Sequence, residues 1–511
     1  MICLTVGLLV WGAAPVARAG GGNPQEDIPL DSWIYDAVFA LTSRGHFPDL
    51  LLHTRPYTRG EVAEGVAALH RREREFDTGE YILLRRLKAE FHEELADRPE
   101  AMRPASRARL GVGATGHIDQ FDDGFSKNRY GFDALAAFAA PSVLAMRSRV
   151  RFDSDGRHDT QFHGEYWKEN FTAWVDQAVV TARLPRFTAA FGREFWRWGR
   201  SPVDAMLISD HSPPFDGLRL VYRGGNWSYA FHATMLDAMY IDALGTLRRY
   251  LVGHRFNWRP HRNFELALSE VILFGGVNRP WEFNYLNPIL PYYWEQLNTD
   301  TDDNPLWNVE VSWRFHSAWE VYGEWMIDDF QIDFVSEPQQ IGVMGGLVWW
   351  PGVFDGRLML NAEYQRVNTF VYGQRRPWNR YIHYRDINDE VIGIGSDLGT
   401  DADRITVRPR WYLSRNLDLT GLAEYVRRGE NRIDTDQAGP LPGGEDFPSG
   451  IVERTLTLGL GTHGQAGGHL VVDLMVGYQR IENVEHERDV DCDGPFMQLR
   501  FTALWWKTFG N

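Results

Sequence analysis

The chain has 511 residues, of which 44% are hydrophobic, and it carries a formal net charge of −16. This acidic balance argues against nucleic acid as a ligand, because contacts to phosphate groups need a basic surface. A bundle of transmembrane helices is excluded as well, since no stretch approaches about 18 uninterrupted apolar residues.

The N-terminus carries the one concentrated apolar run, residues 4–16, which is short and is followed by the small-x-small sequence ARA. This arrangement predicts a signal peptide over residues 1–19, cut after Ala19. One of the two cysteines, Cys3, lies in that segment, so Cys492 is alone in the mature chain. A disulfide framework is therefore excluded, and we predict no cofactor and no metal site.

A small helical domain is predicted over residues 20–106, because apolar residues recur there with helical spacing. The three faces are as follows: Trp33, Ala37, Ala40 and Leu41; Val62, Val66 and Leu69; and Tyr81, Leu84, Leu87 and Phe91.

Part of this domain resembles one S-layer-homology repeat. The resemblance rests on DSWIYDAVFALTSRGHF at residues 31–47 and RPYTRGEVAEGVAALHR at residues 55–71. Such modules can hold cell-wall polymers, but a single copy is more often structural, so both roles stay open. Peptidoglycan and export machinery are the partners that this domain would meet.

The remainder, residues 107–511, shows the period-two alternation of strands with one apolar face. In RITVRPRWYL, residues 404–413, Ile405, Val407 and Trp411 share one face and arginines occupy the other. Strands of about ten residues with apolar outer faces, even in number, predict a transmembrane antiparallel β-barrel of about 18 strands, mainly β. A soluble β-sandwich is the alternative, but it would not require these outer faces. The predicted strands begin near residues 107, 131, 144, 170, 185, 217, 227, 246, 262, 306, 318, 340, 355, 404, 415, 450, 468 and 495.

The links between these strands differ in length by parity. Links after even-numbered strands are short, whereas links after odd-numbered strands carry nearly all the long insertions, such as residues 275–305 and 368–403. Outer-membrane barrels have short periplasmic turns and long extracellular loops. We therefore predict an outer-membrane protein with extracellular loops and a periplasmic N-terminal domain, in contact with outer-membrane lipid.

Four parts of the barrel region resemble the Wzi-type capsule-assembly outer-membrane proteins. They are FGREFWRWG with LISDHSPPFDGLRLVYR, NRPWEFNYLNPILPYYWEQLNTDTDDN, VYGEWMIDDFQID, and LNAEYQRVNTFVYG with GSDLGTDADRITVRPRWYL. Their order and spacing match over roughly residues 185–430. The resemblance implies an 18-stranded outer-membrane barrel with a periplasmic helical domain, which acts as a surface lectin for capsular polysaccharide.

The alternation also assigns charged residues to the barrel interior. They could pair across strands and keep the lumen wet and rigid, or they could take part in the passage or recognition of a ligand. The predicted lumen residues are Glu310, Arg314, Glu324, Glu363, Arg408, Arg410 and Arg500.

The long loops combine aromatic rings with carboxylates and amides, a mixture that suits carbohydrate, since rings stack on sugars and polar groups bind hydroxyls. The alternative is that the rings belong to the interfacial aromatic girdle. The candidate polysaccharide-binding residues are Trp198, Asp210, Trp281, Tyr285, Tyr293, Trp294, Asp302 and Asp303.

Catalytic signatures are missing from the sequence: no serine stands in a nucleophile elbow, and no HExxH or P-loop pattern occurs. We therefore predict a non-enzymatic, lectin-like barrel that binds capsular or other surface polysaccharide and helps assemble or retain it on the cell. The alternative is a porin-like diffusion channel with a charged lumen.

Overall fold

The structure is a computed structural model. It describes residues 23–96, 106–121, 126–140, 143–156, 159, 161–162, 166–168, 171–299, 301–329, 339–387, 390–435, 446–466 and 469–509. The predicted signal peptide, residues 1–19, lies outside these ranges. Within them, none of the helices combines the length and the apolarity needed to traverse a bilayer.

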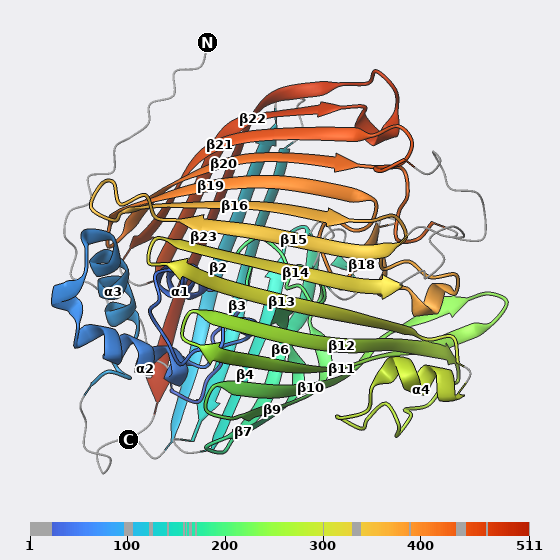
Figure 1. The fold of residues 1–511 in the computed structure, drawn as a ribbon, viewed down its shortest axis with the longest axis horizontal. Helices are drawn as coiled ribbons and strands as arrows, with labels where there is room; N and C mark the ends of the chain where they lie inside the picture. The colour runs from blue at the N-terminus through green and yellow to red at the C-terminus, as the bar shows by residue number, and fades with distance from the viewer. Residues whose placement is uncertain are drawn as a thin grey trace.

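Among the described residues, eighteen strands form a closed antiparallel barrel (Figure 1), which confirms the predicted fold class. Each strand begins within five residues of its predicted start. The barrel closes where the first strand pairs with the last, from Ala108 opposite Phe509 to Phe121 opposite Phe496. The strands are β2 (Arg107–Phe121), β3 (Ser126–Ala139), β4 (Leu144–Asp153), β6 (Phe171–Arg183), β7 (Phe187–Glu194), β9 (Phe215–Arg223), β10 (Trp227–Ile241), β11 (Gly245–His261), β12 (Phe264–Val277), β13 (Asn304–His316), β14 (Trp319–Asp329), β15 (Gln340–Trp349), β16 (Leu358–Val367), β19 (Ala402–Ser414), β20 (Leu417–Arg428), β21 (Glu453–Ala466), β22 (Leu470–Glu482) and β23 (Cys492–Phe509).

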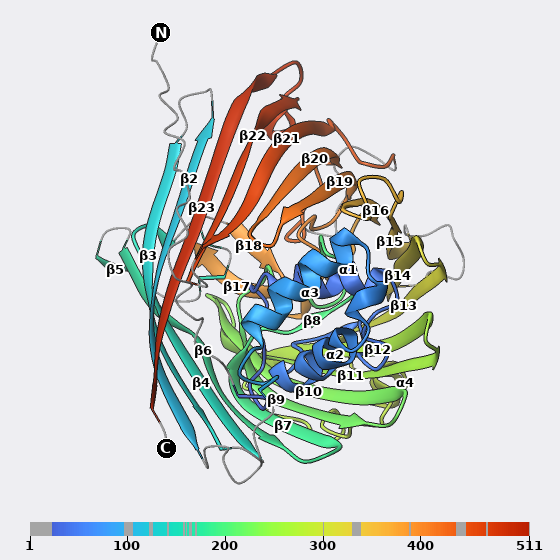
Figure 2. The ribbon, with the colours of Figure 1, turned by 90° about the vertical axis from the view of Figure 1, so that its left-hand side faces the viewer.

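The two ends of the barrel differ. At one end, short turns such as residues 224–226 and 415–416 join the strands, and the helices α1 (Ile34–Ser43), α2 (Arg59–His70) and α3 (Thr78–Glu90) lie in the mouth (Figure 2). We call this the helical end. The opposite end, the loop end, carries the long connections, including residues 278–303 and 368–401.

The helices begin where side chains satisfy their free N–H groups. Thr58 and Glu61 form a capping box at the start of α2, and Asp77 and Glu80 form a second one at the start of α3. The inner faces of the helices form one core that continues into the barrel wall at Trp350, whose Nε1 donates to Ser43 Oγ at 2.9 Å. One predicted core residue is wrong, since the ring of Tyr81 is 43% exposed.

A buried arginine fastens α3 to the turn between β19 and β20. The Arg86 guanidinium makes two bonds to the carboxylate of Asp418, at 2.7 and 2.9 Å, and donates to the carbonyls of Ser414 and Arg415. Both charged side chains are almost fully buried, at 3% and 0% exposure. The helical domain is thus held to the barrel by charge-assisted bonds as well as by apolar packing.

Several smaller elements were not predicted. β1 (Thr54–Arg55) pairs with β8 (Arg197–Trp198), and β17 (Ile382–Ile387) pairs with β18 (Glu390–Gly393). β5 (Tyr166–Lys168) extends the barrel beside β6, and α4 (Tyr292–Thr299) follows β12. In sequence these segments read as loop because each is short, and β1 and β8 also lie far apart along the chain.

We expect Arg86→Ala to weaken the docking of the helical domain by roughly 2–4 kcal/mol, because it leaves a buried carboxylate with one partner fewer. Asp418 keeps its bond to Arg410 at 2.9 Å, which places the expected loss below that of a fully unpaired charge. The measurement is the opening free energy of the helical domain from native-state proteolysis. The matched control is Arg85→Ala, which removes an exposed neighbour; equal losses in both variants would contradict the prediction.

Candidate functional site

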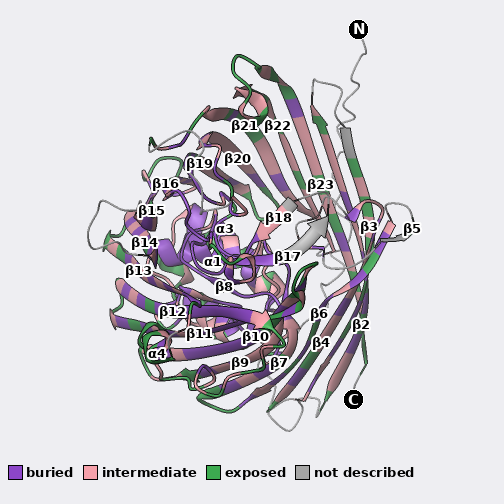
Figure 3. Cartoon of the chain, turned by 90° about the vertical axis from the view of Figure 1, so that its right-hand side faces the viewer, coloured by how far each residue is buried: buried purple, intermediate pink, exposed green. Residues whose placement is uncertain are grey.

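The barrel interior is filled from both ends, by segments that meet inside it. The segment 195–214 enters from the loop end, and its strand β8 pairs with β1 of the helical domain, with Thr54 opposite Trp198. Gly199 also donates its N–H to the His53 carbonyl at 2.9 Å. Figure 3, viewed from the loop end, shows buried helices and chain segments across the interior.

Next to this junction, two strands and the helical domain share one buried charge network. Arg255 of β11 makes two bonds to the carboxylate of Glu310 on β13, at 2.6 and 2.8 Å. His53, from the helical domain, places its Nδ1 2.8 Å from the same carboxylate, and all three side chains are fully buried. The predicted lumen residue Glu310 therefore bonds to an inserted segment as well as to the wall.

Two further predicted lumen residues hold the segment 195–214. Glu324 accepts the Met206 N–H at 3.0 Å, and Glu363 accepts the hydroxyl of Ser201 at 2.6 Å. Carboxylates that accept such bonds fix the path of an irregular backbone. The expectation that charged lumen residues pair across strands is therefore correct only in part. Several of these residues bind inserted segments of the chain.

The other predicted lumen residues lie in the same interior. Arg408 donates to the Pro202 carbonyl at 3.3 Å, and Arg410 pairs with Asp36 of α1 at 2.6 Å. The guanidinium of Arg314 lies against Gly45 (φ +92°), where an added Cβ would approach its Cζ to 2.4 Å. Glycine there permits both the turn after α1 and this close approach.

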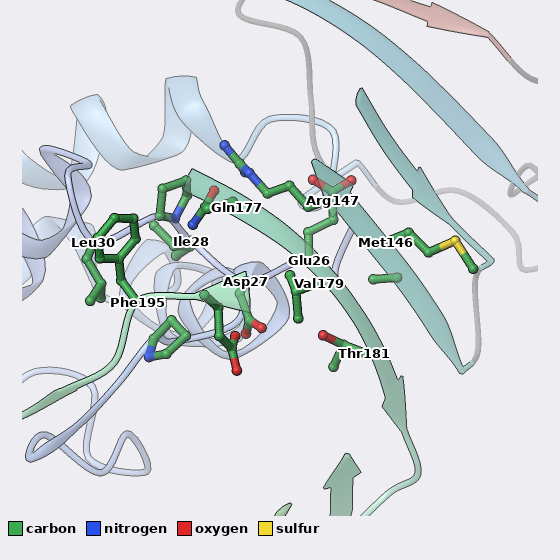
Figure 4. Close-up of a pocket in the computed structure, with 14 residues that line it drawn as sticks. Glu26, Asp27, Ile28, Leu30, Met146, Arg147, Gln177, Val179, Thr181 and Phe195 are labelled. Carbon is green, nitrogen blue, oxygen red and sulfur yellow. The ribbon is translucent and has the colours of Figure 1, made fainter. Parts of the chain in front are cut away.

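Acidic residues at the start of the helical domain face arginines of the wall. Asp27 pairs with Arg219 at 2.9 Å, Asp31 with Arg149 at 2.6 Å, and Glu26 with Arg109. Figure 4 shows Glu26 and Asp27 beside Arg147, Gln177 and Thr181 of the wall. The N-terminal segment is therefore held by several ion pairs spread over the strands.

These pairs change the acidity of the carboxyl groups. Desolvation alone would raise the pKa of Asp31, but the guanidinium groups near it, Arg149 first and then Arg151 and Arg147, together outweigh desolvation and lower the pKa to about 2. Burial and Arg410 act in the same opposed way on Asp36, whose pKa is also lowered to about 2. Both groups thus stay ionised at any neutral or mildly acidic pH.

At the loop end, the segment 368–401 closes over the segment 195–214. Asp204 accepts bonds from Ser396 Oγ at 2.6 Å and from Gln365 Nε2 at 2.8 Å, and the Tyr372 hydroxyl donates to the Met206 carbonyl. A continuous series of contacts therefore runs from the helical domain through the barrel to the loop end.

Space remains beside the helical domain, as a cavity of about 870 Å³ against β2–β4 and β21–β23. Its wall carries charges of both signs, among them Arg147, Asp133 and Asp473. The predicted lumen residue Arg500 lies here, at the register position opposite His117. This part of the lumen is open and lined by polar residues, and it is bounded by the inserted segments.

The predicted sugar-binding residues do not form one site. Trp198 has no exposed surface in the β1–β8 junction. Asp210 pairs with Arg197 at 2.8 Å near the same segment, and Asp302 pairs with Arg376 at 3.0 Å on the surface of the loop end. Asp303 is buried, where it binds Arg279 at 2.8 Å.

The other four candidates belong to the segment 278–299, which packs on the outside of the barrel. Trp281 lies on Tyr250 of β11, with ring centroids 4.4 Å apart, and Tyr293 lies on Trp307 of β13 at 4.9 Å. Tyr285 has no exposed surface, whereas Trp294 is 61% exposed. Trp198, Tyr285 and Asp303 therefore offer no surface to a polymer.

Sequence reasoning missed His53, Arg255 and Arg376. Alternation marks Arg255 as inward, but it does not tell which partner meets it. Nothing in the sequence signals that His53 reaches the barrel centre.

Residues 144–493, more than half of the chain, match the family model described as capsule assembly protein Wzi. The chain belongs to the Wzi family of capsule assembly proteins. This confirms the family resemblance and makes the chain an outer-membrane β-barrel of a capsule assembly family and not an enzyme. The matched residues begin after the helical domain, so its likeness to an S-layer-homology repeat stays a prediction.

Among solved structures, the chain is similar to Wzi of Escherichia coli, described as an outer membrane protein involved in group 1 capsule assembly and a carbohydrate-binding β-barrel. The TM-score is 0.60 at 13% identity, covering 93% of this chain and 98% of that one, so the likeness concerns the fold. Two Pseudomonas aeruginosa proteins, OccD3 (OpdP) and opdK, give TM-scores of 0.46 and 0.45 at 10% and 14% identity, covering 78% of this chain and 91% and 99% of theirs. No curated protein sequence gives a significant match.

The helical domain should loosen only in strong acid. A carboxyl whose pKa is lowered on docking, here from 3.8 to about 2 at Asp31 and Asp36, favours docking above pH 3.8 and loses that effect as the pH falls to about 2. Pepsin digestion between pH 4 and pH 2 would measure this. We expect D31N/D36N to be cleaved faster at pH 4 and to depend less on pH, while D49N, an exposed control, should follow the unmodified protein. Equal resistance of the unmodified protein at pH 4 and pH 2 would contradict this.

Proposed function

We propose that this protein binds capsular or other surface polysaccharide at its loop end and helps to assemble or retain it on the cell. The observation that carries the proposal is the β1–β8 junction, where segments from both ends meet inside the barrel. A barrel filled in this way suits binding at its surface better than diffusion through its centre. Membership of the Wzi family supports the same choice.

The proposal includes an orientation. The loop end faces the outside of the cell, and the helical end faces the periplasm, in keeping with the short turns of one end and the long connections of the other. Peptidoglycan and the export machinery are then the partners within reach of α1–α3.

We place sugar contacts on the loop-end patch of Asp302, Arg376 and Trp378. The carboxylate and the guanidinium are 61% and 50% exposed, and the guanidinium lies 6.0 Å from the ring centroid of the half-buried Trp378. A ring beside exposed donors and acceptors can stack on a sugar and bind its hydroxyls. Each contact is weak, so retention of a repeating polymer comes from many copies acting together.

A strain that lacks the gene should release polysaccharide into the medium and keep less on the cell, and the intact gene should restore retention. Complementation with D302A/R376A/W378A should restore at most about half of it, because the patch is removed. The control is R432A/D434A, which removes another exposed ion pair of the loop end, 3.3 Å long. Unchanged retention in the deletion strain would overturn the proposal, and full retention by the triple variant would overturn this site.

The filled interior also predicts the behaviour of the purified protein. In planar bilayers we expect no stable, step-like currents, because inserted segments occupy the barrel centre. Regular single-channel steps would instead favour the porin-like alternative and would place the conducting path in the cavity beside β2–β4.

A further inference from the structure

The segment 278–299 leaves the loop end and turns back along the outer wall of the barrel. Its rings join outward-facing residues of β10–β12 in one apolar cluster, in which Tyr285 packs on Phe274 with ring centroids 4.8 Å apart. Arg279 and Pro288 accept bonds at their carbonyls from Tyr250 and Tyr229 of the wall. Figure 1 and Figure 2 both show α4 outside the barrel beside β11 and β12.

Under this segment, a pair of ionisable side chains interrupts the apolar outer wall. His254 of β11 stands directly opposite Glu270 of β12, and their side chains pair at 3.2 Å. Their outward neighbours along the strands are apolar, for example Val252 and Ile272. Ionisable groups that face hydrocarbon are costly, so a bare pair would destabilise the inserted barrel.

The segment covers this pair with a backbone N–H donor for the carboxylate and an aromatic ring for the imidazole. The Tyr293 N–H, in the first turn of α4, donates to the Glu270 carboxylate at 2.9 Å. The Tyr292 ring has no exposed surface and lies 4.7 Å from the His254 ring. Glu270 thus anchors the start of the helix, where a carboxylate is favoured.

The distance of Glu270 from the loop end places this residue in the apolar band of the barrel wall. Glu270 lies seven residues before Val277, the loop-end residue of β12. At about 3.3 Å per residue along a strand, this is roughly 20 Å from that end, and the apolar band of such barrels is about 25 Å tall. The segment therefore lies against wall that faces the membrane.

The polarity of the segment is that of a lipid-facing surface. Its three charged side chains are bonded within the protein: Arg279 to Glu282 at 2.7 Å, and Glu295 to Asn284 at 3.0 Å. Its outward face is mostly apolar, with Phe283 90%, Ile289 78% and Leu297 60% exposed, and the polar residues exposed there, such as Asn287 and Asn298, are uncharged. A water-exposed loop would show the reverse pattern.

We propose that residues 278–299 form a membrane-embedded flap, whose outward face contacts lipid acyl chains in the leaflet at the loop end and whose inner face shields the His254–Glu270 pair. The occupant is lipid, because the apolar face continues the outer wall of a transmembrane barrel. Trp281, Tyr293 and Trp294 then act at the lipid boundary and do not bind polymer. The inference needs membrane insertion only and does not depend on polysaccharide binding.

The test places a nitroxide spin label on single cysteines, in a C492S background, in the full-length protein reconstituted in phospholipid vesicles. The reporters are F283C and L297C, with I289C as a substitute where one of these fails to give a heat-modifiable, folded barrel. L460C, 72% exposed on the outer wall of β21, is the lipid control. R432C, 63% exposed at the loop end, is the water control.

Power saturation then compares collisions with oxygen, which concentrates in lipid, and with a nickel chelate, which stays in water. We expect the oxygen-to-nickel ratio at positions 283 and 297 to match that at 460 and to exceed that at 432 several-fold. A ratio like that at 432 would show a water-exposed loop and overturn the flap. Protection from both reagents would also overturn it, since a second copy or another protein would then cover the face.

Discussion

The arrangement depends on ion pairs between the barrel wall and the segments inserted into it. A buried charge is costly unless a partner of opposite sign and good geometry meets it. Arg255 and Glu310 bind each other on the wall, and His53 completes their network from the helical domain. Wall and inserted segments therefore stabilise one another, because an empty barrel would leave such groups to water and an undocked domain would lose its partners.

On the outer wall, which faces lipid, polar side chains likewise need bonded partners from another segment. Inside, carboxylates such as Glu324 receive N–H groups from an inserted segment; outside, Glu270 receives the Tyr293 N–H from a segment that folds back. In both places a polar side chain on a strand fixes the position of an irregular segment. The pairing of the strands fixes the position of each carboxylate, and each carboxylate in turn fixes the position of the segment that donates to it.

The strands could be predicted from the sequence because each one obeys a local rule, the alternation of apolar and polar residues. The paths of the long connections could not be predicted, because they depend on distant partners. Glu310 reads as inward from its strand alone, but no local pattern links it to His53, 257 positions earlier. The segment 278–299 shows a second limit, since aromatic rings among amides suit a sugar surface and a membrane boundary alike. Its polar partners on the wall, His254 and Glu270, are the sequence signal that separates the two.

The filled interior also bears on how the loop-end patch could hold a polymer. Arg376 and Trp378 belong to the segment 368–401. This segment is held inside the barrel by two of its own residues: Tyr372 donates to the Met206 carbonyl, and Ser396 donates to the Asp204 carboxylate. Wall residue Arg249 further donates to the Trp378 carbonyl at 2.9 Å. The patch is thus supported by buried bonds, so its side chains lose less conformational freedom on binding than those of a free loop. If the patch binds sugar as proposed, weak contacts to each sugar suffice, because a fixed patch adds its small binding energy to that of neighbouring copies along the same chain.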